Sequence, residues 1–138
     1  MTVQDICSFS AGKWVGCDDE ARQIFSAITG DLIARAGNSS LDIEAMLDFA
    51  RTVGGPALRT LTFHDRARLI KSLALVLVEK KQMLYDISFS TGATQKDHVI
   101  DIDGGIGTLF SFASIGRREM PDDQIYLDGP VEPLSRNG

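Results

Sequence analysis

Asp101-Ile-Asp-Gly-Gly-Ile-Gly-Thr-Leu109 places three glycines inside a segment, 95–116, that otherwise has a helical pattern. Each glycine in a helix interior costs about 1 kcal/mol relative to alanine. A sequence keeps that cost where another group approaches the backbone closely. We therefore expect a neighbouring helix or strand to pack against Gly104, Gly105 and Gly107. A ligand phosphate is the alternative.

The spacing of the glycines favours packing over phosphate binding. A dinucleotide-binding loop needs its glycines at a turn from a strand into a helix, with the helix N-terminus facing the pyrophosphate. Here the helical stripe already begins near Asp97, and Phe110 stands where the third glycine of that motif would be. The run is therefore predicted to be a helix-packing feature.

Helical patterns also precede this segment. Thr62 and Asp65 form a capping pattern, and Thr94 and Asp97 repeat it at the start of 95–116. The helix after Thr62 has a broad apolar face that predicts a well-buried helix, formed by Ile70, Leu73, Ala74, Leu77 and Val78. A further helical piece carries Met83, Leu84 and Ile87 and ends near Thr91-Gly92.

The two ends of the chain read differently. Residues 8–36 predict short strands and turns, with a hairpin around Thr29-Gly30-Asp31. A helix follows from Ser39 and is predicted to end at Gly54-Gly55-Pro56. After Met120-Pro121 the periodicity disappears, and residues 121–138, up to Asn137-Gly138, predict an extended tail. The chain is thus expected to be mostly helical, with a short N-terminal β-hairpin region and an extended C-terminal tail.

Composition limits the function. The 138 residues carry a net charge of −5, so a nucleic-acid partner is not expected, and no basic patch suggests a membrane surface. No apolar run is judged long enough to cross a membrane, and the start of the chain has no signal pattern. The cytoplasm is the expected location.

The cysteines and the acidic cluster are the first candidates for chemistry. Cys7 and Cys17 could pair, but they lack zinc-site spacing and a nearby base, so we expect reduced structural thiols. The densest set of possible metal ligands is Asp97, His98, Asp101 and Asp103. Carboxylates in a first helical turn are already explained by capping and by the helix dipole.

The other polar candidates have simple structural interpretations. His64-Asp65-Arg66 is read as a capped helix start with a salt-bridging arginine, since adjacent helix residues point apart. Lys13, Lys80 and Lys81 are read as solvated charges, and Arg117-Arg118 as a C-terminal helix signal. Ser8, Ser10 and Ser90 lack a recognisable His/Asp arrangement. No catalytic, cofactor-binding or metal residue is therefore predicted in this chain.

The order of several motifs resembles the N-terminal part of aldehyde dehydrogenases. These motifs are Gly12-Lys-Trp14, Ile28-Thr-Gly-Asp-Leu-Ile-Ala34, Phe49-Ala-Arg51, Asp65-Arg-Ala67 and Ser90-Thr-Gly92. Others are similar to the bifunctional dehydrogenases of phenylacetate degradation, which carry a hydratase-like domain: Gly55-Pro-Ala-Leu-Arg59, Thr91-Gly-Ala-Thr94, Asp101–Phe110, Arg118-Glu-Met-Pro-Asp-Asp123 and Pro133-Leu-Ser135. The resemblance covers nearly all of this chain, but only the first part of the family's longer one.

The resemblance implies an α/β parent fold, with residues 1–120 in the cofactor domain and 121–138 leading into an oligomerisation hairpin. The usual Glu-x-Gly-Lys pattern is replaced by Ser90-Thr91-Gly92-Ala93, which favours the CoA-semialdehyde branch. Within this branch, the semialdehyde dehydrogenases of aerobic benzoyl-CoA breakdown are a close competitor to those of phenylacetate degradation. The family's catalytic cysteine, general-base glutamate, oxyanion-binding asparagine and nucleotide-binding segments lie beyond the matched region, and neither Cys7 nor Cys17 takes the nucleophile's position.

The resemblance therefore implies an N-terminal fragment of an NAD(P)-dependent, CoA-linked semialdehyde dehydrogenase that is inactive by itself. NADP or NAD would bind the complete parent, with a CoA-linked semialdehyde as its substrate, and none is expected to bind this chain alone. Homo-oligomers through the C-terminal edge strand are expected. Two alternatives stay open: a stand-alone helical interaction module, and a small metal enzyme at Asp97, His98 and Asp101.

Overall fold

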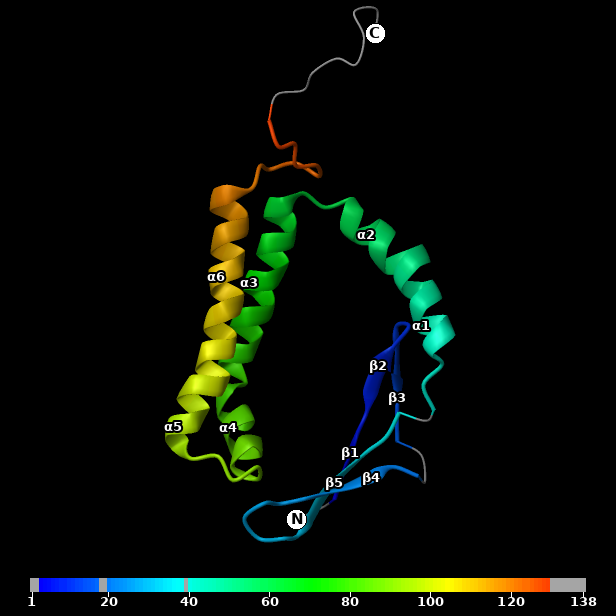
Figure 1. Cartoon of the computed structure of the whole chain (residues 1–138), viewed down its shortest axis with the longest axis vertical. Coiled ribbons are helices and arrows are strands. Elements are labelled where there is room, and N and C mark those ends of the chain that lie inside the picture. The colour runs from blue at the N-terminus through cyan, green and yellow to red at the C-terminus, as the bar shows by residue number, and fades with distance from the viewer. Residues whose placement is uncertain (1–2, 18–19, 39, 130–138) are drawn as a thin grey trace, which may run out of the picture.

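The computed structural model describes residues 3–17, 20–38 and 40–129, which form an open arch (Figure 1). Helices α3 and α6 stand side by side as one limb, α1 and α2 form the other, and the strands lie between their lower ends. The strands are β1 (Gln4–Ile6), β2 (Ser8–Ser10), β3 (Lys13–Val15), β4 (Arg22–Phe25) and β5 (Leu32–Ala36). The helices are α1 (Ile43–Phe49), α2 (Gly55–Arg59), α3 (Phe63–Glu79), α4 (Lys81–Phe89), α5 (Gln95–His98) and α6 (Gly104–Glu119).

The strands form two small sheets. A three-stranded sheet has the order β1-β5-β4, in which β1 runs parallel and β4 antiparallel to β5. The loop between β4 and β5 contains the predicted Thr29-Gly30-Asp31 turn, and Gly30 takes a positive φ of 74°. The hairpin is therefore confirmed. The parallel pairing of β1 with β5 joins residues thirty apart, which local pattern does not reveal.

Strands β2 and β3 form the second sheet, a hairpin closed by Ala11 and Gly12. Both turn residues have positive φ, 46° and 79°, as two-residue hairpin turns require. Phe9 and Trp14 face each other across this hairpin with their ring centroids 5.1 Å apart. Both rings are exposed, so the hairpin presents an aromatic surface instead of enclosing one.

Gly54-Gly55-Pro56 does not end the first helix as predicted. Helix α1 passes through a π-helical turn, η1 (Ala50–Gly54), directly into α2. The turn shifts the hydrogen-bond frame, so Pro56 falls in the first turn of α2, where a missing N–H is tolerated. A Cβ on Gly55 would lie 3.1 Å from the Ala50 carbonyl oxygen. Glycine avoids that close approach at the turn and does not terminate the helix.

Helix α3 begins as predicted. The Thr62 side chain accepts from the Asp65 N–H, and the Asp65 carboxylate accepts from the Thr62 N–H, which completes the capping box. The chain then bends at Lys80, whose φ of −92° and ψ of 3° separate α3 from α4. At the end of α4 the Ser90 carbonyl accepts from the Ala27 N–H at 2.8 Å, which ties α4 to the β4–β5 loop.

The segment predicted as 95–116 is a continuous helix that runs to Glu119. It consists of α5, a π-helical turn η2 (Val99–Asp103) and α6, and a second complete capping box, Thr94 with Asp97, starts it. Gly116 does not end it. The helix stops where Met120 turns extended, because a residue before proline is disfavoured in the helical region, and Pro121 follows.

By length and composition, the helix Gln95–Glu119 could cross a membrane, so the prediction that no segment is apolar and long enough was wrong. The charged side chains are confined to its two ends and the η2 turn, and the remainder is apolar or small. One such helix is weak evidence for a span, since core helices of soluble proteins pass the same test. In this structure α6 packs along α3.

The glycine run does not pack closely against another described element, which corrects the prediction. A Cβ built on Gly104, Gly105 or Gly107 would meet no atom within 4 Å. The close contact is about two and a half to three turns further on, where a Cβ on Gly116 would lie 3.2 Å from the Ala67 Cβ. The glycine run therefore lies on an exposed side of α6, while Ile106, between Gly105 and Gly107, is buried.

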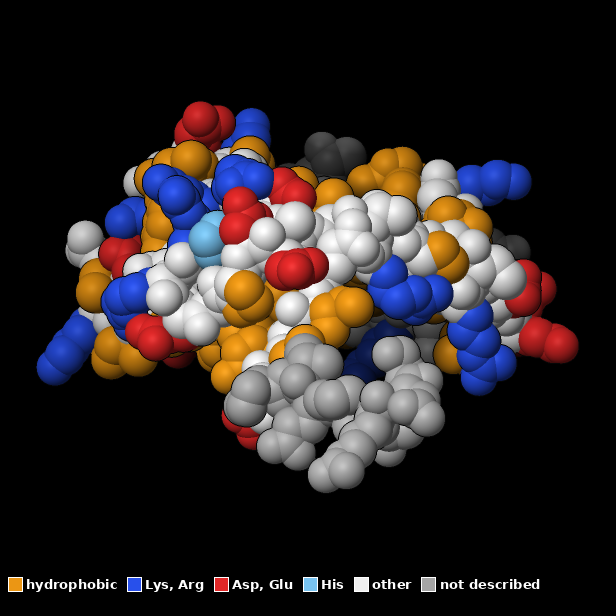
Figure 2. Space-filling model, turned by 90° about the horizontal axis from the view of Figure 1, so that it is seen from above, with side chains coloured by type: hydrophobic (Ala, Val, Ile, Leu, Met, Phe, Trp, Pro, Cys, Tyr) orange, Lys and Arg blue, Asp and Glu red, His pale blue; other side chains and the backbone are white. Residues whose placement is uncertain are grey.

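The described core is small. Its buried apolar residues are Ala34, Ala67, Ala74, Ile106 and Ala113, and the largest fully buried side chain is His98. The broad apolar face of α3 was predicted to be well buried, but of its five residues only Ala74 is buried. Leu73 and Val78 are about half exposed. Figure 2 shows apolar side chains reaching the surface between charged ones on the face it views.

The segment after α6 folds back onto the start of α3. The Phe63 N–H donates to the Asp123 carbonyl at 2.9 Å, and the Thr62 hydroxyl donates to the Asp122 carboxylate at 2.7 Å. His64 Nε2 lies 2.9 Å from the Met120 carbonyl oxygen. Residues 121–129 form no helix or strand, but they bend back onto α3 instead of extending away from it, and 130–138 lie outside the described residues, Asn137-Gly138 included.

Candidate functional site: a basic groove between two helices

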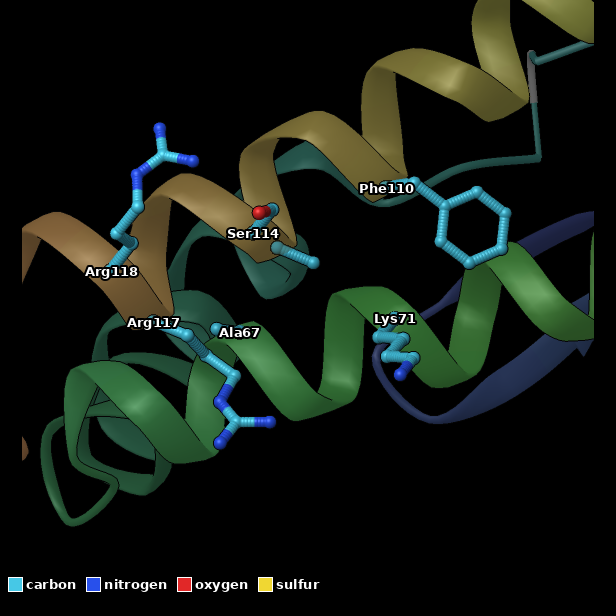
Figure 3. A pocket seen from close by; sticks show the side chains of 7 residues that line it. Ala67, Lys71, Phe110, Ser114, Arg117 and Arg118 are labelled. Carbon is cyan, nitrogen blue, oxygen red and sulfur yellow. The ribbon is translucent and has the colours of Figure 1, made fainter.

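A groove of about 430 Å³ lies between α3 and α6, and cations are its main polar groups (Figure 3). Lys71 lines it from α3, and Ser114 and Arg117 line it from α6. The lining residues are Ala67, Lys71, Phe110, Ala113, Ser114, Arg117 and Arg118, with no carboxylate among them. In a chain with a net charge of −5, this is a local concentration of positive charge.

The small residues of the helix pair create the groove. Ala67, Ala113 and Gly116 let α3 and α6 approach each other, and the side chains that flank this contact then form the rims. Helical spacing places Lys71 one turn after Ala67, and places Phe110 and Arg117 on either side of Ala113. The sequence therefore sets one cation on each helix beside the line of contact.

The three cations differ in how free they are. The Arg118 Nε donates to the Glu119 carboxylate at 2.6 Å, and in Figure 3 the Arg118 side chain projects away from α3. Arg117 reaches across the α3 side of the groove. Among the described residues, neither Lys71 nor Arg117 forms an ion pair. Their charges are available to an anion placed in the groove.

The second polar cluster ties α4 to η2 and is internally satisfied. Tyr85 donates to Asp103 at 2.5 Å, and Lys81 donates to the other Asp103 oxygen at 2.9 Å. The hydrogen bonds from Tyr85 and then Lys81 hold the pKa of Asp103 below its ordinary value. The hydrogen bond to Asp103 in turn raises the pKa of Lys81. The interpretation of Lys81 as a solvated charge was therefore wrong.

His98 lies beside this cluster in an aromatic setting. Its ring stacks on Tyr85 at a centroid distance of 5.2 Å and meets the Phe89 ring edge-on at 4.4 Å. Neither ring nitrogen has a hydrogen-bond partner among the described residues. Asp97 is held by Thr94, whose hydroxyl and N–H lower the Asp97 pKa.

The metal alternative at Asp97, His98 and Asp101 has no support in this geometry. His98 is buried against rings, and Asp97 caps its own helix. Within the described residues, no three His, Cys, Asp or Glu side chains are grouped to hold a metal. The glycine run cannot form a pyrophosphate cradle either, because it lies inside a helix and not at a strand-to-helix turn.

The remaining sequence candidates are dispersed. Cys7 is exposed, while the Cys17 thiol lies 3.3 Å from the Arg35 carbonyl, and both are free. His64-Asp65 is the capped helix start that the pattern predicts, but Asp65 pairs with Arg68. Arg66 instead donates to the Leu61 carbonyl and covers the Phe63 ring, so its predicted salt bridge was wrong.

Sequence reasoning missed the basic groove. It read Arg117-Arg118 only as a helix end and did not weigh Lys71. The available signal was the pair of small residues Ala67 and Gly116, because close helix contact beside flanking cations predicts a charged groove. That pairing could not be recognised before the partner helices were known.

The sequence comparisons connect this segment to an enzyme. No protein-family model matches the chain. It is 34% identical over 113 residues to a 3,4-dehydroadipyl-CoA semialdehyde dehydrogenase of Aromatoleum evansii. The match covers 81% of this chain but 22% of the relative, so the chain spans only a minor part of that protein's length. The resemblance to the aldehyde dehydrogenases is thereby confirmed, and the chain is related to a segment of a CoA-linked semialdehyde dehydrogenase.

Proposed function

We propose that this chain is the N-terminal segment of an NAD(P)-dependent, CoA-linked semialdehyde dehydrogenase of aromatic-compound (phenylacetate) degradation in the cytoplasm, and that it is catalytically silent alone. The observation that carries the proposal is the 34% identity to a CoA-semialdehyde dehydrogenase over 81% of the chain. Both thiols contact backbone carbonyls, Cys7 that of Asp5 and Cys17 those of Ile6 and Arg35, and a backbone carbonyl does not activate a thiol as a nucleophile.

Within such an enzyme, the segment's own contribution is to hold the CoA part of the substrate in the basic groove. CoA carries phosphate groups and an adenine ring. Lys71 and Arg117 supply unpaired cations for phosphate, Ser114 supplies a hydroxyl donor, and the Phe110 ring offers a face for the base. The contact acts on substrate position, because no carboxylate, histidine or cysteine lies among the groove residues to activate a nucleophile.

Titration calorimetry of the chain with CoA tests the groove. We expect binding that weakens about tenfold in Lys71→Gln and in Arg117→Gln, since loss of one charge-assisted contact costs about 1.4 kcal/mol. Lys96→Gln is the matched control, because it removes one positive charge from an exposed residue that does not line the groove. An equal loss of CoA affinity in all three variants would show that binding depends only on the net charge of the chain, and would contradict a site in the groove.

An activity assay tests the silent state. We expect no oxidation of a CoA-linked semialdehyde by the purified chain with either NAD+ or NADP+. Turnover that persists in a Cys7→Ser, Cys17→Ser double variant would point to chemistry elsewhere in the chain. Turnover lost in that variant would place the nucleophile here. Either form of turnover contradicts the proposal.

A second candidate function is a stand-alone interaction module that associates through residues 120–138. Ile125, Tyr126 and Leu127 favour it, because all three are more than half exposed at the end of the described chain. Light scattering during size exclusion distinguishes the two. A monomer that binds no partner would contradict the module, whereas a dimer dispersed by Tyr126→Asp would support it.

A further inference from the structure

A second groove, of about 890 Å³, lies between the three-stranded sheet and α4. Large apolar side chains gather in it from both sides, and several of them are about half exposed or more: Ile6, Trp14, Phe25, Met83 and Ile87. Leaving such side chains in water forfeits the favourable free energy that their burial would give. Exposed apolar surface of this extent, gathered in a single hollow, is typical of an interaction site.

The charge of this groove is opposite to that of the basic groove. Asp5 and Asp86 line it, and none of its described lining residues is lysine or arginine. Asp5 is neutralised by two contacts with Arg35, at 2.8 and 3.0 Å. Asp86 accepts a hydrogen bond from Gln82 at 3.0 Å, and no described cation pairs with it. The groove therefore disfavours an anionic ligand such as a CoA ester and favours an apolar group that carries a cation.

We propose that this groove is the docking surface for an amphipathic helix, with a lysine or arginine opposite Asp86, from the part of the dehydrogenase polypeptide that lies outside the matched segment. The proposal rests on the proposed function, since it takes the chain to be part of such an enzyme. The matched segment is 22% of the relative, which leaves most of that polypeptide to cover surfaces exposed here.

A helix fits this groove because it could lie beside α4 and form a helical layer over the sheet. Sheets bury a face under helices, and α4 and the three-stranded sheet each form a wall of this hollow. A second helix beside α4 would cover Phe25 and Ile87 together. Its apolar stripe would face the sheet, and its cation would reach Asp86 on α4. Asp86 is the groove carboxylate that has no ion pair among the described residues, so this contact would give it a partner.

The isolated chain tests whether the groove is an open apolar site. The neutral dye Nile red should bind it, and Met83→Glu should reduce the dye's emission by at least half. Leu69→Glu on α3 is the matched control, because Leu69 is 55% exposed, Met83 is 51% exposed, and only Met83 lines the groove. An equal response of both variants would contradict a specific apolar groove.

A full-length chimaera tests the occupant. This chain replaces the matching segment of the Aromatoleum evansii dehydrogenase, and alkylation of Cys7, an exposed residue of the groove, is followed by peptide mass spectrometry. Cys7 should react at least tenfold more slowly in the chimaera than in the isolated chain. Asp86→Lys should restore much of that reactivity, and Asp48→Lys on α1 should not.

The outcomes separate this inference from the proposed function. A chimaera that binds CoA through Lys71 while Cys7 stays fully reactive would overturn the docking helix and leave the proposed function intact. Protection that is unaffected by Asp86→Lys would overturn the paired cation. Protection of Cys7 that Asp86→Lys removes would support the docking helix, whether or not the isolated chain binds CoA.

Discussion

The two ends of α6 use glycine in different ways. At its end, Gly116 faces the Ala67 Cβ across the contact with α3, so the missing side chain is explained by packing. At its start, Gly104, Gly105 and Gly107 face open space. The same residue type therefore has a described partner in one half of the helix and none in the other. Glycine in a helix shows that closeness is permitted, but it does not show which neighbour uses it.

Overpacking the close end should have the largest effect. Gly116→Leu places a branched side chain where even a Cβ would lie 3.2 Å from Ala67, and we expect a loss of about 1–3 kcal/mol in the free energy of unfolding. Urea unfolding followed by circular dichroism measures it. Gly107→Leu, in the open half, is the control, and an equal loss there would remove the distinction between the two ends.

Removing a cap should cost less. Thr94→Ala deletes the hydroxyl that caps the helix leading into the glycine run, and we expect a loss of about 1 kcal/mol. Thr62→Ala should cost at least as much, because that hydroxyl also holds Asp122 of the segment that follows α6. A smaller loss at Thr62 than at Thr94 would show that the contact with Asp122 adds no stability.

Filling the open end should stabilise the chain slightly. Gly105→Ala is expected to raise the free energy of unfolding by about 0.5–1 kcal/mol, since alanine is the better helix former and no described atom obstructs its Cβ. Gly116→Ala should gain less, because Ala67 has to yield. Paired urea midpoints measure the difference. A loss in Gly105→Ala would reveal a neighbour at the open face.

Changing the pH should give the smallest and most gradual effects. Hydrogen bonds from Thr94 hold the pKa of Asp97 below its ordinary value, so its contribution to stability is present above that value and is lost as the pH falls through the lowered pKa. Asp103 has the same sign. The pKa of Lys81 is raised, so its contribution is present below the ordinary lysine value and is lost as the pH rises through the raised one.

Asp97→Asn and Lys81→Met check these signs in urea midpoints measured from about pH 2 to about pH 11. Asp97→Asn should flatten the acid limb, and Lys81→Met should flatten the alkaline limb. A steeper acid limb in Asp97→Asn would contradict the assigned direction.

Local chemistry made part of the fold predictable from sequence. Both capping boxes, the Thr29-Gly30-Asp31 turn and the long helix after Thr94 follow from contacts within a few residues. Gly54-Gly55-Pro56 was predicted to end the first helix, but a π-helical turn shifts the hydrogen-bond pattern there. Pro56 then needs no N–H donor, and the helix continues. The basic groove escaped notice because Lys71 and Arg117 come together only when α3 and α6 pack.

The sequence by itself determined where helices begin, that the chain is mostly helical, and that it resembles an aldehyde dehydrogenase, because capping, turn chemistry and shared motifs are local properties. The tertiary structure alone decided which glycine is packed and which cations share a groove. Both depend on the close approach of residues such as Ala67 and Gly116, which lie 49 positions apart in the chain. Their contact is set by how two helices fit together, and no local pattern encodes that fit.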